Sequence, residues 1–147
     1  MEGTPPPPPP PPPSGYGSGG STPPVKNPLI DYWKKVVLQN YVNFQGRARR
    51  AEFWWFTLAN LIAVVVLLVL TAISNIFFLL YILYGLALIL PSLAVTVRRL
   101  HDTDKSAWFL LLYLIPFVGP IIILVLMLID STRGTNRYGA SEKYPAV

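Results

Sequence analysis

Two long stretches without charge dominate the pattern of polar and apolar residues along the chain. The first runs from Phe53 to Val97 and the second from Trp108 to Ile129, and neither contains Asp, Glu, Lys, Arg or His. A charged side chain in the hydrocarbon core of a bilayer costs about 2.5–3.5 kcal/mol, so such stretches are typical of membrane segments. The pattern therefore predicts an all-α membrane protein with its membrane domain within residues 47–130.

The first uncharged stretch is too long for a single transmembrane helix. At about 1.5 Å per residue it would extend roughly 67 Å, about twice the ~30 Å hydrocarbon core. The polar pair Ser74-Asn75 lies near its middle. We therefore expect a turn at this pair and two transmembrane helices, at about 53–73 and 76–97.

The second uncharged stretch predicts a third, proline-broken membrane segment at about 108–129. Pro116 and Pro120 interrupt it, and Pro120 has no amide hydrogen to donate to the carbonyl of Pro116. Two arrangements remain open. A kinked spanning helix would place the C-terminus outside, whereas a re-entrant hairpin of two half-length helices would keep it inside. The basic tail favours the inside.

The N-terminal part of the chain has two different sections. Residues 1–24 contain the proline run Pro5 to Pro13 and a Gly/Ser-rich linker, which predict a disordered extension and a possible docking segment for a protein partner. Residues 25–46 predict an amphipathic helix and turn, with Asn27 as N-cap and Pro28 at the first helical position. We expect this helix at the membrane interface; the alternative is an amphipathic helix packed on protein.

Basic residues cluster at one end of both predicted transmembrane helices. They are Lys34, Lys35, Arg47, Arg49 and Arg50 before the first helix, and Arg98, Arg99 and Lys105 after the second. Positive residues beside membrane helices mark the cytoplasmic side, so the N-terminus is expected in the cytoplasm. The net charge of +5 and the pI near 9.6 are interpreted as anchoring to an anionic leaflet, and no nucleic-acid partner is expected.

Residue types suited to catalysis are scarce. The chain has no cysteine, no Gly-x-Ser-x-Gly pattern and no Walker-type or dinucleotide-binding loop. The sole histidine, His101, lies near Asp102 and Asp104 but lacks the second ligand group that a zinc site needs. We therefore expect no catalytic residue, metal or cofactor, and an enzyme is the least favoured class.

The polar residues around the membrane segments form a candidate cluster. Arginine forks match phosphate geometry, so the cluster is suited to anionic lipid headgroups. Acidic members within it favour the alternative, a structural salt-bridge network that joins the first helix to the loop after the second. Residues 131–147 are the polar C-terminal tail, and the motif at residues 134–139 within it is expected to be ordered and to fold back onto this cluster. The predicted members are Arg47, Arg49, Arg50, Glu52, Arg98, Arg99, His101, Asp102, Asp104, Asn136 and Arg137.

Four ordered motifs resemble one known family. They are residues 41–54 (YVNFQGRARRAEFW), residues 98–102 (RRLHD) followed by 106–108 (SAW), residues 115–119 (IPFVG) and residues 134–139 (GTNRYG). The chain is similar, over about residues 30–139, to the bacterial inner-membrane family called domain of unknown function 805. The resemblance implies a multi-pass protein of the inner membrane and supplies no established reaction. Ala107 stands where many members have glycine.

Two functions from different classes follow. The first is a non-enzymatic membrane scaffold or interaction protein with a basic cytoplasmic face. The alternative is a small transporter or an anionic-lipid-binding protein. A transporter would need a homo-oligomer, because few polar groups lie within the membrane segments to line a solute path. Those groups are mainly Thr57, Asn60, Thr71 and Thr96.

Overall fold

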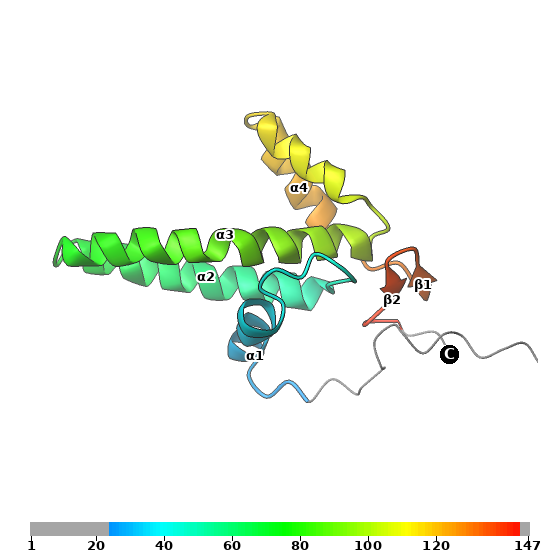
Figure 1. Cartoon of the computed structure of the whole chain (residues 1–147), viewed down its shortest axis with the longest axis horizontal. Helices are drawn as coiled ribbons and strands as arrows, with labels where there is room; N and C mark the ends of the chain where they lie inside the picture. Colours follow the sequence, from blue (N-terminus) through cyan, green and yellow to red (C-terminus); the bar gives the residue numbers. More distant parts are fainter. Residues whose placement is uncertain (1–23, 145–147) are drawn as a thin grey trace, which may run out of the picture.

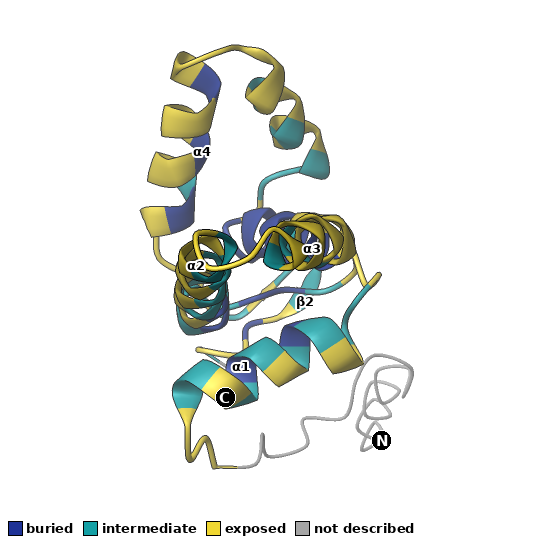
Figure 2. Cartoon of the chain, turned by 90° about the vertical axis from the view of Figure 1, so that its left-hand side faces the viewer, coloured by how far each residue is buried: buried dark blue, intermediate teal, exposed yellow. Residues whose placement is uncertain are grey.

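Two long antiparallel helices form the body of the protein. The computed structural model describes residues 24–144, so nearly all of the proline-rich extension lies outside the described residues. Helix α2 (Arg50–Thr71) and helix α3 (Ile76–Asp102) lie side by side (Figure 1). Both are long and apolar enough to cross a membrane. Much of their apolar surface is exposed, as lipid-facing helices require (Figure 2).

The helix ends differ from those expected at the charged end of the two long helices. The turn at residues 72–75 includes the predicted Ser74-Asn75 pair. Helix α2, however, begins at Arg50 instead of about residue 53, and α3 continues to Asp102 instead of ending near residue 97. Most of the charged residues in these extra turns are buried in ion pairs, so the helices continue through them; these residues are Glu52, Arg98, Arg99 and Asp102.

Pro91 lies inside α3, and its missing amide hydrogen is compensated. Without that hydrogen, the carbonyl of Ala87 has no helical donor. The hydroxyl of Tyr41 donates a hydrogen bond to this carbonyl. The Tyr41 hydroxyl thus replaces the missing helical donor and links the N-terminal segment to α3.

The N-terminal segment packs against the long helices. Helix α1 (Pro28–Lys34) follows Asn27, has Pro28 at its start, and continues as the π-helix η1 (Lys35–Gln39). Val36 is buried in a core with Ala48, Phe56 and Val95. The Trp33 indole donates to Asn60 Oδ1 of α2 at 3.2 Å. Much of the apolar stripe that the sequence placed at the lipid interface therefore contacts protein.

Residues 107–128 form a hairpin of two short helices. The 3₁₀ helix η2 (Ala107–Leu114) and helix α4 (Val118–Leu128) run side by side and project from the body (Figures 1 and 2). The chain reverses at residues 115–117, where Phe117 has a φ of +63°. A Cβ atom on Gly119 would collide with the backbone carbonyl of Leu112, so the close approach of the two arms requires glycine there. Of the two arrangements left open by the sequence, the chain adopts two half-length helices.

The tail returns to the end of α3. Strands β1 (Thr135–Asn136) and β2 (Gly139–Ala140) pair in an antiparallel hairpin. Figure 1 shows this hairpin beside the C-terminal end of α3, at the opposite end of the body from the turn between α2 and α3. The polar parts of the chain therefore gather at one end of the two long helices.

Candidate functional site

A buried carboxylate, Glu52, links the N-terminal segment to α3. Its side chain is fully buried in the first turn of α2. Arg98 Nη1 lies 2.7 Å from Oε1 and Lys35 Nζ lies 2.7 Å from Oε2. A buried carboxylate is stable only with such partners, because an unpaired charge in a low dielectric is costly. Glu52 therefore fixes η1, α2 and α3 relative to one another.

Lys35 extends this contact to the tail. Its ammonium group also lies 2.9 Å from Glu142. Burial lowers the pKa of Lys35, but the two carboxylates outweigh burial and raise the pKa above the ordinary value of 10.5. The side chain is thus a stable cation that bridges two acidic groups.

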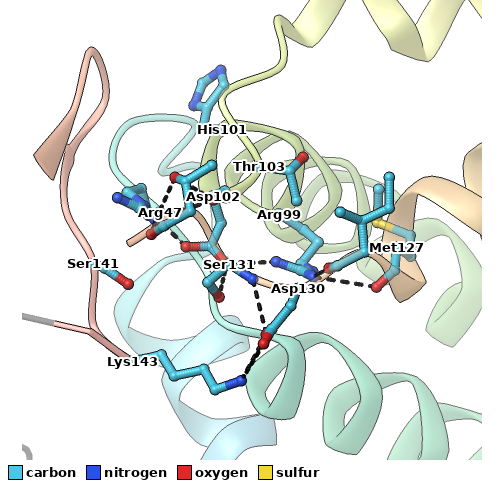
Figure 3. Close-up of polar contacts among 12 residues, drawn as sticks. Arg47, Arg99, His101, Asp102, Thr103, Met127, Asp130, Ser131, Ser141 and Lys143 are labelled. Atoms are coloured by element: carbon cyan, nitrogen blue, oxygen red, sulfur yellow. Dashed lines mark hydrogen bonds and ion pairs between the residues drawn. The ribbon is translucent and has the colours of Figure 1, made fainter. Parts of the chain in front are cut away.

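A second buried carboxylate, Asp102, is the last residue of α3. Arg47 Nε lies 2.9 Å from its Oδ1, and the other oxygen contacts the Arg99 guanidinium and the Ser131 hydroxyl (Figure 3). Arg47 and Asp102 are both almost completely buried. This carboxylate joins the loop before α2, the end of α3 and the start of the tail.

Arg47 uses its remaining donors on backbone carbonyls. Its Nη1 donates to Gly134 at 2.9 Å and to Gly139 at 3.2 Å, and its Nη2 donates to Thr132 at 2.6 Å. The guanidinium group presents five donors in a planar fork, so one side chain can satisfy several acceptors at once. Arg47 therefore holds the segment before β1 and the start of β2 against the end of α3.

Arg99 attaches the hairpin of η2 and α4 to the same cluster. Its Nη2 donates to the carbonyl of Ile129 and lies 3.4 Å from the carbonyl of Met127. The last carbonyls of a helix lack partners within the helix, and a cation stabilises that end. Arg99 thus anchors the end of α4 to α3.

His101 has neighbours other than the predicted carboxylates. Its imidazole ring stacks on Tyr138 with centroids 3.8 Å apart, and its Nδ1 lies 3.3 Å from the carbonyl of Gly46. Asn136 Nδ2 donates to the backbone carbonyl of His101 at 2.9 Å. Within residues 24–144, no group of three or more His, Cys, Asp or Glu residues lies together. The arrangement around His101 positions the tail.

Most of the predicted polar residues lie in this network, but three of the arginines do not. Arg137 forms an exposed pair with Asp104 at 3.2 Å. Arg49 lies over the ring of Tyr32, and Arg50 forms no ion pair within residues 24–144. The sequence did not indicate several partners, because they come from distant parts of the chain. These are Lys35, Asp130, Ser131, Thr132, Glu142 and Lys143.

Comparisons with known proteins place the chain among membrane proteins. The family model described as "Protein of unknown function (DUF805)" matches residues 41–140. Inner membrane protein YhaI of Escherichia coli (strain K12) is 46% identical over 113 residues, which cover 76% of this chain and 96% of YhaI. Inner membrane protein YhaH of the same strain is 47% identical over 116 residues, with the same two coverages of 76% and 96%. The uncharacterized protein YiiR of that strain is 35% identical over 135 residues, covering 71% of this chain and 88% of YiiR. No solved structure matches the chain.

Proposed function

The chain belongs to the DUF805 family, and from this premise we propose that it is a multi-pass, non-enzymatic scaffold of the bacterial inner membrane. Its relatives YhaI and YhaH are inner membrane proteins, so this chain is a bacterial inner-membrane protein in contact with the lipid bilayer. In the proposed arrangement α2 and α3 cross the bilayer and α1 lies near the interface. The hairpin re-enters the membrane, and both termini lie in the cytoplasm.

The observation that carries the scaffold proposal is the internal pairing of the buried charges. Glu52 and Asp102 each contact two cations, and these contacts join α2 and α3 to η1 and the loop before α2. Arg47 and Arg99 then attach the tail and the hairpin. Charges held in this way are suited to maintain the shape of a cytoplasmic face, where a partner would bind.

The position of the tail supports the cytoplasmic C-terminus. Arg99 of α3 contacts the end of α4, and Arg47 contacts the tail that follows. The polar ends of α2, α3 and the hairpin therefore lie together (Figure 1). If the basic end of α2 faces the cytoplasm, as the positive-inside rule predicts, the tail does so too.

The transporter alternative has less support. Thr57, Thr71 and Thr96 each donate to a carbonyl of their own helix. Asn60 Oδ1 accepts bonds from Trp33 and Tyr84. These polar groups are engaged within the protein, so few remain to replace the hydration shell of a solute.

Paired reporters test the topology. Green fluorescent protein, which fluoresces in the cytoplasm, and alkaline phosphatase, which is active outside it, are fused after Val147 and inserted after Ser74. We expect fluorescence at Val147 and phosphatase activity at Ser74. Phosphatase activity at Val147 would mean that residues 108–129 span the bilayer, and would refute the single-face arrangement.

Photocrosslinking in intact cells tests the scaffold role. In one variant a photoreactive residue replaces Arg133, which is exposed in the tail. In the control variant it replaces Ile73, which is exposed in the turn between α2 and α3. We expect one discrete protein adduct from the tail position, and its loss when Arg47→Met releases the tail. Identical adducts at both positions, or none at the tail, would contradict the proposal.

A second candidate function is the binding of anionic lipid. The observation that favours it is the absence of carboxylate partners for Arg49 and Arg50 within the described residues. Both lie immediately before the aromatic residues at the start of the first transmembrane helix.

A further inference from the structure

We propose that Arg49, Arg50 and Lys143 form a binding site for the phosphate group of an anionic glycerophospholipid. Together with Ala51 they line a hollow of about 400 Å³ at the cytoplasmic end of α2. The proposal deepens the lipid-binding candidate by naming its residues, and it rests on the proposed orientation of α2 in the membrane.

The charge around the hollow is positive. Within residues 24–144, six of the twelve Lys and Arg residues pair with carboxylates: Lys35, Arg47, Arg98, Arg99, Arg137 and Lys143. Arg49 and Arg50 do not pair within residues 24–144, and Lys143 pairs with Asp130 at 2.7 Å. Three cations and one carboxylate leave a local charge of +2, which suits one or two phosphodiester groups.

Arg49 is positioned by its neighbour but retains a donor. Its guanidinium carbon lies 5.3 Å from the centre of the Tyr32 ring, and its Nη2 contacts the Tyr32 hydroxyl. Its Nη1 donates no hydrogen bond within residues 24–144, and the side chain is only half-buried. A phosphate oxygen can therefore accept a charge-assisted hydrogen bond from this donor.

The depth of the hollow favours a lipid over a soluble phosphate. Arg50 precedes Trp54 by four residues in the same helix, which at 1.5 Å per residue is about 6 Å along the axis. Tryptophan side chains at the ends of membrane helices lie at the level of the headgroups. The guanidinium groups therefore lie where lipid phosphates are concentrated.

Three other arginines predicted for headgroup binding are inaccessible, and Arg137 is exposed but pairs with Asp104 outside the hollow. Arg47, Arg98 and Arg99 are 5%, 3% and 0% exposed, and each contacts a carboxylate. A headgroup would have to displace these internal pairs to reach them. The structure thus reduces the predicted set to Arg49 and Arg50 and adds Lys143 from the tail.

The test measures lipid-dependent thermal stability of the full chain in detergent. Phosphatidylglycerol, phosphatidylcholine and inorganic phosphate are titrated into the wild type, the double variant Arg49→Gln/Arg50→Gln, and the control Lys105→Gln/Arg133→Gln. The control removes the same charge from residues outside the hollow. A ligand that binds the folded state raises its melting temperature with concentration, so the titration reports affinity.

We expect only phosphatidylglycerol to stabilise the wild type and the control. Each cation near an anionic membrane surface contributes about 1 kcal/mol, so losing both arginines should weaken apparent affinity about thirtyfold. Equal affinity in the double variant, or an equal response to phosphatidylcholine or inorganic phosphate, would overturn the proposal. A double variant that melts far below the wild type without lipid is replaced by the single variants Arg49→Gln and Arg50→Gln. Each should weaken apparent affinity for phosphatidylglycerol about fivefold, and unchanged affinity in both would refute the site. The topology reporters test the orientation separately.

Discussion

Replacement of Arg47 by methionine tests whether the buried ion pairs hold together the polar end of α2 and α3. The change removes the contact with Asp102 and the bonds to the carbonyls of Thr132, Gly134 and Gly139. Removal of one partner from a buried pair costs about 3–5 kcal/mol. Because Asp102 keeps the Arg99 contact and the Ser131 hydroxyl, we expect the low end, about 3 kcal/mol.

The measurements are thermal unfolding in detergent and hydrogen exchange of the tail. A loss of about 3 kcal/mol corresponds to a melting temperature lower by about 6–12 °C in a chain of this size. The amides of β1 and β2 should also exchange faster, because Arg47 holds the carbonyls of this region. Arg137→Met is the matched control, since its pair with Asp104 is exposed (61% and 48%) and contributes about 0–1 kcal/mol. Equal melting temperatures for the two variants would refute the structural role of the cluster.

Three further predictions concern other parts of the fold. Tyr41→Phe should destabilise the protein by about 1 kcal/mol, because the Ala87 carbonyl, which lacks a helical donor on account of Pro91, then has no hydrogen bond. In a Pro91→Ala background, which restores the helical bond, Tyr41→Phe should cause no loss. Thermal unfolding of the single and double variants measures both effects. Gly119→Ala should open the hairpin of η2 and α4, because the added Cβ would collide with the backbone of Leu112. Gly85→Ala, with nothing within 4 Å, should not open it. Cysteine crosslinking between η2 and α4 compares the two variants, and equal crosslinking would contradict the packing. The pKa of Asp130 is lowered from 3.8 to about 2 by its hydrogen bonds to the Lys143 ammonium and the Ser131 backbone amide. Its contribution to stability is therefore present above pH 3.8 and is lost as the pH falls through about 2. An NMR titration of this carboxyl group with a midpoint near 3.8 would contradict this.

Local patterns were enough to predict the two long apolar helices. The uncharged stretches and the polar pair Ser74-Asn75 predicted two transmembrane segments, and α2 and α3 are two apolar helices of that length. Hydrophobicity along the chain determines this, because the cost of a charge in lipid depends on the residue and its depth and hardly on the partner. The resemblance to the family rested on short motifs, and the family match confirms it.

The structure of the cluster required contacts between distant residues. The sequence predicted that arginines and carboxylates would lie together, but Lys35 and Glu142 are 107 positions apart and nothing local links them. Likewise, the arginine run before α2 looks uniform in sequence. In three dimensions Arg47 is 5% exposed and is bonded to the tail, while Arg49 and Arg50 have no carboxylate partner among the described residues.

The sequence by itself determined the class of protein, its two long apolar helices and the end at which its charges gather. The tertiary structure decided that residues 107–128 form a hairpin, because the proline-interrupted segment permitted both a kinked helix and a reversal. It also decided which charges are buried in ion pairs and which have no carboxylate partner among the described residues. The physical reason is that hydrophobic burial in lipid is a property of each segment, whereas an ion pair depends on the distance between two groups that only the folded chain brings together.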